Sequence, residues 1–265
     1  MRRALWGLVL AVPLSALAQG NGVDWQRQVL RVTGDGPPDV KASNPSQARL
    51  GAERSAKEDA FADLLEQAKG LRLRADRTVG EEMAREETRR QVEDVLRGYK
   101  VVQTRFFSDS GVQLEVEVPL GALTAVLVTP APAGTAAPSE TNPAGTKPAG
   151  TKKNARAKHT GLVVDARKLG MTPVLAPRLI DAATGERLYG LASLGAEARE
   201  KAGVAGFFQK LEDARKAGRV GAKPLVIEAA RLQGSDLQLG PDEVKKLGEL
   251  EPRLLAEGRV AILIQ

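Results

Sequence analysis

The sequence predicts an α+β fold made of two small mixed-sheet domains. Three observations lead to this prediction: alanines that recur every four residues in one long segment, short alternating stretches typical of strands, and a Pro/Ala/Gly/Thr-rich segment between the two halves. We place the domains at residues 19–128 and 159–265, with a disordered linker at 129–158. Residues 1–18 are interpreted as a cleaved signal peptide.

The first residues follow the order of parts that secretory signals share. Arg2 and Arg3 precede a short apolar stretch, and Ala16 and Ala18 supply the small residues that a signal peptidase needs before its cut. The apolar stretch is much shorter than the roughly 20 residues that span a bilayer. We therefore predict cleavage between Ala18 and Gln19 and export of the mature chain.

The chain contains no cysteine. A lipoprotein signal attaches its lipid to a cysteine at the cleavage site, so we expect a mature chain with neither a lipid anchor nor a transmembrane segment. The missing cysteines also exclude disulfides, thiolate metal ligands and cysteine nucleophiles. Aromatic residues are only 3% of the chain, so the cores must be built mainly from Ala, Val and Leu.

The N-terminal domain is expected to begin with a strand followed by a long helix. Residues 23–33 alternate well enough for a strand, which Gly34 and Gly36 help to end. Gly70 is placed to end a helix over residues 46–69, whose small alanine face lets another element approach closely. The apolar face of this helix consists of Ala48, Ala52, Ala56, Ala60, Phe61, Leu64, Leu65 and Ala68.

A further strand, a second helix and a hairpin complete this domain. Residues 71–78 predict the strand, and residues 79–97 predict a charged helix closed by Gly98. Residues 99–107 and 112–119 predict two strands joined by a Ser-Asp-Ser-Gly turn. Val and Leu alternate with Gln and Glu in the second of these strands. One face of the sheet should therefore be wet, and we expect the alanine-striped helix to cover the other.

The C-terminal domain is predicted to combine short strands with helices. Its last strand is a continuous apolar run, which is typical of a central strand covered on both faces. Strands are expected at 161–166, 178–189 (a hairpin), 225–232, 237–239 and 260–264, and helices at 196–217, with breaks near Gly203 and Gly206, and from Gly240-Pro241-Asp242 onward.

No catalytic, cofactor-binding or metal-binding set of residues stands out, so we assign none and expect a protein that is not an enzyme. His159 is the only histidine, and it lies beside the low-complexity segment, where a general base would lack an orienting partner. Gly34-Asp35-Gly36 is a fragment of a phosphate-binding loop, but prolines follow where the helix would have to begin.

Two other functions stay open. An exported hydrolase of glycan or peptidoglycan would need paired carboxylates, and Asp24, Asp165 and Asp181 are candidates because they lie near strand ends. Each of them equally suits a cap or a turn. A weak polyanion binder would act through the basic end of the linker. The net charge of +6 does not indicate nucleic acid, because acids and bases are interleaved elsewhere and no aromatic-basic alternation is present.

Several short segments of the N-terminal domain together resemble a known family. These segments are Val23-Asp24-Trp25, Thr33-Gly34-Asp35-Gly36-Pro37, Ala48-Arg49 at the head of the alanine-striped helix, Asp109-Ser110-Gly111, and Val116-Glu117-Val118-Pro119-Leu120. As a set they are similar to the twenty-kilodalton bacterial surface-lipoprotein family and to the N-terminal domain of flagellar assembly protein T. The resemblance implies an envelope protein of Gram-negative bacteria without known catalysis, often lipid-anchored or attached to a larger machine. Together with the predicted export signal, it implies a soluble chain in the periplasm of a Gram-negative bacterium. The chain differs from the lipid-anchored members of the family because it lacks the cysteine that carries their lipid.

These observations favour a non-enzymatic exported protein of the cell envelope, an accessory or assembly factor that binds other envelope proteins. We expect binding through strand edges and exposed apolar residues, and no nucleic-acid partner. Trp25, Phe207 and Phe208 are the candidate partner contacts. Apolar neighbours also favour a core position for Trp25, and one residue of the Phe pair is expected in the core while the other is an exposed anchor.

Overall fold

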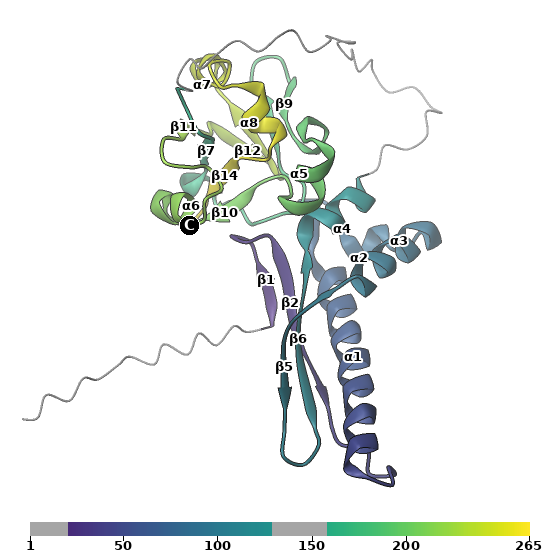
Figure 1. Cartoon of the computed structure of the whole chain (residues 1–265). Coiled ribbons are helices and arrows are strands. Elements are labelled where there is room, and N and C mark those ends of the chain that lie inside the picture. Colours follow the sequence, from purple (N-terminus) through teal and green to yellow (C-terminus); the bar gives the residue numbers. More distant parts are fainter. Residues whose placement is uncertain (1–20, 129–157) are drawn as a thin grey trace, which may run out of the picture.

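The computed structural model describes residues 21–128 and 158–265 (Figure 1). We call these two parts the N-terminal unit and the C-terminal unit. The α+β class predicted from the sequence is confirmed. The predicted signal peptide with its Ala18–Gln19 cleavage site, and all of the predicted linker except Lys158, lie outside the described residues. The domain boundaries stay predictions.

The N-terminal unit is a four-stranded antiparallel sheet with one long helix across it. Its helices are α1 (Pro45–Gly70), α2 (Val79–Glu82), α3 (Glu86–Arg97) and α4 (Leu120–Leu127). The strands β1 (Gly22–Asp24), β2 (Val29–Gly36), β5 (Lys100–Phe106) and β6 (Val112–Pro119) form a sheet in the order β1-β2-β6-β5, and β3 (Arg72–Arg74) and β4 (Arg77–Thr78) form a separate hairpin.

The alanine-striped helix covers the sheet as predicted. Asn44 caps α1 by accepting a hydrogen bond from the backbone N–H of Gln47 at 2.9 Å. The helix packs on β2 and β6, and its buried positions are Ala52, Ala56, Ala60, Leu64 and Ala68. On the sheet side, the alternation of β6 is also confirmed, because Val112, Leu114, Val116 and Val118 are buried.

Three local predictions in this unit were wrong. The single strand predicted at 23–33 is two strands, β1 and β2, separated by a turn in which Gln28 takes a positive φ of 58°. The strand predicted at 71–78 is the hairpin of β3 and β4. The helix predicted at 79–97 breaks between α2 and α3, because Met83–Arg85 leave the helix before a new one begins at Glu86.

The C-terminal unit contains two four-stranded sheets (Figure 1). The first, β10-β14-β7-β11, is parallel throughout, and the second, β12-β13-β8-β9, is mixed. The strands are β7 (Leu162–Asp165), β8 (Arg178–Asp181), β9 (Arg187–Tyr189), β10 (Gly206–Phe208), β11 (Leu225–Glu228), β12 (Arg231–Gln233), β13 (Asp236–Leu239) and β14 (Val260–Leu263).

Short helices connect these strands. They are the 3-10 helices η1 (Arg167–Leu169) and η2 (Leu191–Ser193) and the α-helices α5 (Ala196–Lys201), α6 (Leu211–Lys216), α7 (Pro241–Leu247) and α8 (Pro252–Ala256). The prediction of a central, fully covered last strand is confirmed, since β14 lies between β10 and β7 and all its residues are buried. The helical pattern predicted over 196–217 was wrong in its middle, where β10 pairs with β14. No helix in the described parts of the chain is long and apolar enough to cross a membrane.

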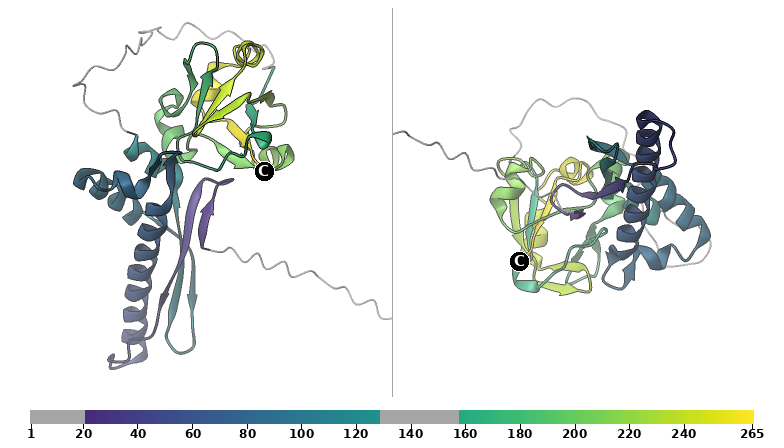
Figure 2. Two further views of the ribbon diagram at one scale, coloured as in Figure 1. Left: turned by 180° about the vertical axis from the view of Figure 1, so that it is seen from behind. Right: turned by 90° about the horizontal axis from the view of Figure 1, so that it is seen from below.

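The two units pack against each other. The C-terminal unit sits over one end of the N-terminal sheet, while the far ends of α1 and the β5–β6 hairpin extend away from it (Figure 1, Figure 2). Backbone hydrogen bonds join them: Leu175 N–H to the Arg72 carbonyl at 2.9 Å, Ala176 N–H to the Leu73 carbonyl at 3.1 Å, and Phe207 N–H to the Trp25 carbonyl at 3.1 Å. Backbone bonds of this kind hold the two units in a fixed relation.

A buried polar contact fixes the centre of the C-terminal unit. The Tyr189 hydroxyl is buried and donates a hydrogen bond to the Val204 carbonyl at 2.6 Å. Tyr189→Phe should lower the free energy of unfolding by about 1 to 2 kcal/mol, because the carbonyl loses its donor and stays buried. Urea unfolding followed by circular dichroism measures this loss. A Tyr99→Phe control, at a half-buried position in the other unit, should change it less, and equal losses would contradict the assignment.

Candidate functional site

The outer strand β5 presents an open sheet edge. It pairs with β6 on one side, and no strand of the described chain pairs with it on the other. All seven of its residues, Lys100–Phe106, are exposed. An edge strand leaves backbone N–H and C=O groups unpaired on its free side, so it can accept another strand.

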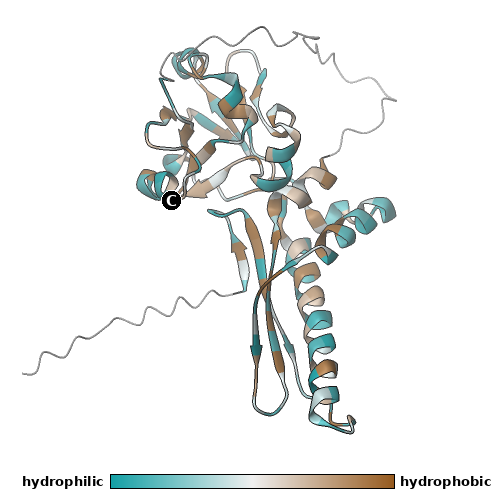
Figure 3. Cartoon of the chain, viewed as in Figure 1, coloured by the Kyte–Doolittle hydropathy of each residue, from teal (hydrophilic) through white to brown (hydrophobic). Residues whose placement is uncertain are grey.

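This edge carries apolar side chains that face solvent. Val101 is 41% exposed, Val102 44%, Phe106 59% and Phe107 47%. The start of the strand is coloured as hydrophobic in Figure 3. Proteins usually protect a free edge with charges, prolines or very short strands. An edge with four exposed apolar residues is therefore a candidate contact surface, and we call β5 with Phe107 the β5 edge.

The wet face of the sheet shows alternating charge from strand to strand. Arg31 on β2 lies opposite Glu117 on β6, and their side chains form an ion pair at 2.9 Å. Glu117 in turn lies opposite Lys100 on β5. Across the three strands, the charges are therefore positive, negative and positive, and the last of them lies at the free edge. A carboxylate on an added strand would continue this alternation, since opposite charges on neighbouring strands are stabilising.

A second row on the wet face ends in the same way. Asp35 on β2 accepts a hydrogen bond from the Gln113 side chain at 2.7 Å, and Gln113 lies opposite Arg105 on β5. Lys100 and Arg105 are the charged residues of β5, which has no carboxylate of its own. The wet side of the β5 edge is thus basic at both ends.

On the opposite face of the sheet, the residues that lie side by side on β6 and β5 are mostly apolar, and α1 covers only part of them. Val116 lies opposite Val101, and Val112 lies opposite Phe106. The valines of β6 are buried, whereas their β5 partners are exposed. Arg49 from α1 places its guanidinium 5.5 Å from the centre of the Phe106 ring, a cation–π contact that orients the ring. The apolar face of the sheet therefore continues past the part that α1 covers.

The predicted contact residues lie elsewhere, at the contact between the units. Phe207 and Phe208 are 2% and 1% exposed, so the expectation that one of them is an exposed anchor was wrong. Both belong to β10, a strand whose three residues are all buried, within the segment predicted to be helical. Trp25 is half-buried and meets the Phe207 ring edge to face, with 5.7 Å between the ring centres. These aromatics join the two units of this chain.

The candidate carboxylates have local structural roles. Asp24 accepts hydrogen bonds from the Gln26 and Arg27 backbone N–H groups at 3.0 and 2.9 Å. A hydrogen bond from the Arg167 side chain lowers the pKa of Asp165, and one from the Ala183 backbone lowers the pKa of Asp181. A general acid needs a raised pKa, so these shifts run opposite to the one that acid catalysis uses.

The described residues also contain no metal-binding cluster. No group of three or more His, Asp or Glu side chains within residues 21–128 and 158–265 could hold a metal ion. His159 is half-buried beside Thr160, whose hydroxyl donates a hydrogen bond to the Val220 carbonyl at 2.7 Å. Gly34-Asp35-Gly36 lies within β2, under the alanines of α1, rather than in a loop before a helix.

Comparisons with known proteins bear on the C-terminal unit. Residues 161–265 match a family model described as the second domain of Treponema pallidum Tp0624. The match begins at the residue before β7 and runs to the last residue, so it covers both sheets of this unit. A search of curated proteins finds no match to the chain.

Proposed function

We propose that this protein is a non-enzymatic, exported component of the cell envelope that binds another envelope protein at the β5 edge. The partner supplies an extended segment that adds to the sheet as a further strand beside β5. The signal-like N-terminus and the resemblance of the N-terminal unit to envelope lipoprotein and flagellar assembly domains support the location. The C-terminal unit matches a family model whose description, the second domain of Tp0624, names no enzyme activity. This match is compatible with a binding role.

The main support for the proposal is the pair of residue sets that β5 presents on the two faces of the sheet. The wet-face rows end in Lys100 and Arg105, and the opposite rows end in Val101 and Phe106. A strand of alternating acidic and apolar residues fits both sets at once, since successive side chains of a strand point to opposite faces. Addition of such a strand is a common mode of peptide recognition.

Replacing the two apolar positions should weaken partner binding without unfolding the protein. In Val101→Asp/Phe106→Asp, each carboxylate would lie on the apolar face of the sheet, next to an apolar side chain of the added strand. We therefore expect affinity for the partner segment to fall at least about tenfold. Both positions are exposed, and the melting temperature should change little. Affinity purification of wild type and variant from a periplasmic extract, followed by binding assays with the recovered partner, measures this loss.

A matched control separates the edge from general surface effects. Val226 is 44% exposed and lies on β11 of the C-terminal unit, away from the β5 edge (Figure 1), so Val226→Asp adds the same kind of charge elsewhere. It should retain the partner. The proposal fails if the edge variant retains the partner as well, or if purified wild-type protein turns over peptidoglycan or another envelope glycan.

A further inference from the structure

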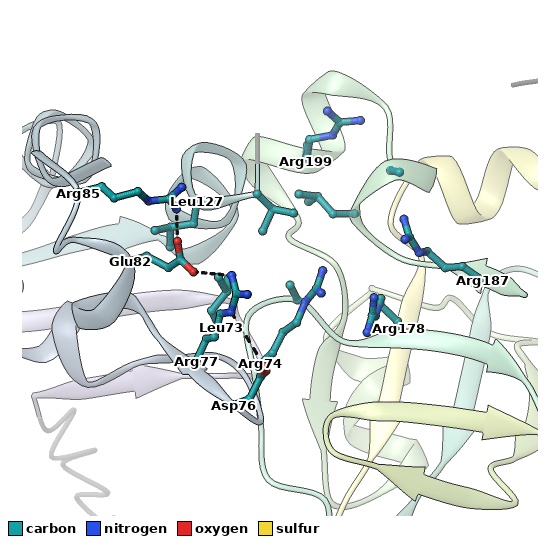
Figure 4. A pocket seen from close by; sticks show the side chains of 14 residues that line it. Leu73, Arg74, Asp76, Arg77, Glu82, Arg85, Leu127, Arg178, Arg187 and Arg199 are labelled. Carbon is teal, nitrogen blue, oxygen red and sulfur yellow. Dashed lines mark hydrogen bonds and ion pairs between the residues drawn. The ribbon is translucent and has the colours of Figure 1, made fainter. Parts of the chain in front are cut away.

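Arginine side chains from both units surround a cavity where the units meet (Figure 4). The cavity has a volume of about 520 Å³, which is within the usual range for sites that bind small organic molecules. Only two carboxylates line it, those of Asp76 and Glu82. The lining arginines are Arg74, Arg77, Arg85, Arg178, Arg187 and Arg199, and we call this cavity the arginine cleft.

Each unit supplies half of these arginines, on walls that are fixed to one another. Arg74 and Arg77 come from the β3–β4 hairpin, and Arg178 and Arg187 come from the facing β8–β9 hairpin. The backbone of β3 accepts hydrogen bonds from Leu175 and Ala176, just before β8. The cleft is therefore formed in the structure as it stands, and a ligand would not need to assemble it.

Three of the arginines already form ion pairs with carboxylates. Arg178 forms a two-pronged pair with Asp236, with its Nε 2.8 Å from one carboxylate oxygen. Arg77 and Arg85 share the buried carboxylate of Glu82, which lies 3.1 Å from the Arg77 guanidinium. Asp76, the other lining carboxylate, lies 4.0 Å from Arg77, so both lining carboxylates face an arginine that is already paired.

The remaining three have few or no partners. Arg74 and Arg187 pair through their backbones in the two hairpins, but their side chains make no hydrogen bond or ion pair with any described residue. Arg199 donates one hydrogen bond to the Leu194 carbonyl at 3.1 Å, but its buried Nε has no partner within the described chain. The pKa of Arg74 is lowered by its partial burial and by the positive charges of Arg178 and Arg187. Such a concentration of like charge favours an anion.

The chemistry of the lining narrows the ligand. Guanidinium groups bind phosphate and carboxylate oxygens through paired N–H donors. Arginines on facing walls match a tetrahedral phosphate, which accepts hydrogen bonds from several directions, better than a planar carboxylate. Leu73, Leu127 and Leu191 also line the cleft and supply apolar surface. We propose that the arginine cleft binds an organic ligand with one or more phosphate groups on a partly apolar body.

Calorimetric titration of the full chain with phosphate compounds tests this site. The probes are inorganic pyrophosphate, glycerol 3-phosphate, and vesicles of phosphatidylglycerol with phosphatidylcholine vesicles as the uncharged reference. We expect at least one phosphate probe to bind. Binding of a soluble probe identifies a free phosphate compound as the ligand type, and binding of phosphatidylglycerol vesicles alone identifies a lipid headgroup.

The variant Arg74→Gln/Arg187→Gln should weaken that binding at least about tenfold, because each change removes a charge-assisted contact. Its melting temperature should not fall, since neither arginine has a partner to lose. The control Arg215→Gln/Lys216→Gln removes the same charge from the exposed end of α6 and should bind as wild type does. If the double variant folds poorly, Arg187→Gln alone, at an exposed position, serves in its place.

Three results would overturn the inference. No phosphate probe binds the wild-type protein; the cleft variant binds as tightly as wild type; or the α6 control loses as much affinity as the cleft variant. The β5 edge shares no residue with the arginine cleft, so failure here leaves the proposed partner binding untouched, and the reverse also holds.

Discussion

Gly36→Ala is expected to destabilise the N-terminal unit by about 3 kcal/mol or more, because the alanine methyl group has no room. A Cβ atom at Gly36 would lie 1.8 Å from the Ala52 carbonyl oxygen of α1, and one at Gly34 would lie 2.2 Å from the Ala56 carbonyl oxygen. Both obstacles are helix backbone, which cannot rotate away. The helix and the sheet would have to separate, and the packing of the alanine face on β2 would be lost.

Thermal unfolding monitored by circular dichroism measures this effect. For a chain of this size, we expect the melting temperature to drop by roughly 6 °C or more. Gly70→Ala is the matched control, because a Cβ there meets no atom within 4 Å. Equal melting temperatures for the Gly36 and Gly70 variants would show that α1 does not approach β2 as closely as described.

Gly121→Ala should have the second largest effect, at the contact between the units. A Cβ on this α4 residue would lie 2.5 Å from the Glu200 carbonyl oxygen and 2.6 Å from that of Arg199, both in α5. We expect a loss of about 2 kcal/mol, since the two helices must move apart. Leu127 and Arg199 line the arginine cleft from these same helices, so affinity for the phosphate probe should fall as well.

Calorimetric unfolding and phosphate titration of the same sample test this second prediction. Gly240→Ala is its control, because a Cβ at Gly240 also meets no atom within 4 Å. The variant should melt lower than the control and bind the probe more weakly. A Gly121 variant that matches its control in both measurements would contradict the packing of α4 on α5.

Local periodicity explains which parts of the fold could be predicted. The alanine repeat of α1 and the alternation in β6 each require only one burial pattern, and both are present in the sequence without reference to other elements. The apolar run of β14 predicted a central strand for the same reason. Such elements can be predicted from the pattern of their own residues alone.

The predictions of local structure that were wrong concern segments whose conformation depends on residues far away in the chain. Gly206–Phe208 form a strand because they pair with β14, more than fifty residues later in the chain. The turn between β1 and β2 depends on the positive φ of Gln28, a residue type that does not mark such turns. These determinants cannot be read from a short window of sequence.

The two candidate sites were even less visible in the sequence. The alternation around Val101 and Phe106 looks like any strand, and only the order β1-β2-β6-β5 shows that this strand is at the edge. Arg74 and Arg187 come together only when the two hairpins face each other. The run of arginines at 72, 74 and 77 was a usable signal, because three of six residues carry the same charge with few acids between them.

The proposed binding of an envelope protein at the β5 edge can be tested by site-specific photocross-linking in living cells. A photoreactive phenylalanine analogue at Phe106 should cross-link to one envelope protein through an extended acidic-apolar segment, and the same analogue at Val226 on β11 should not. The cross-link should disappear when Val101→Asp is added. Absence of a cross-link at Phe106, or equal cross-linking at Val226, would contradict binding at the β5 edge.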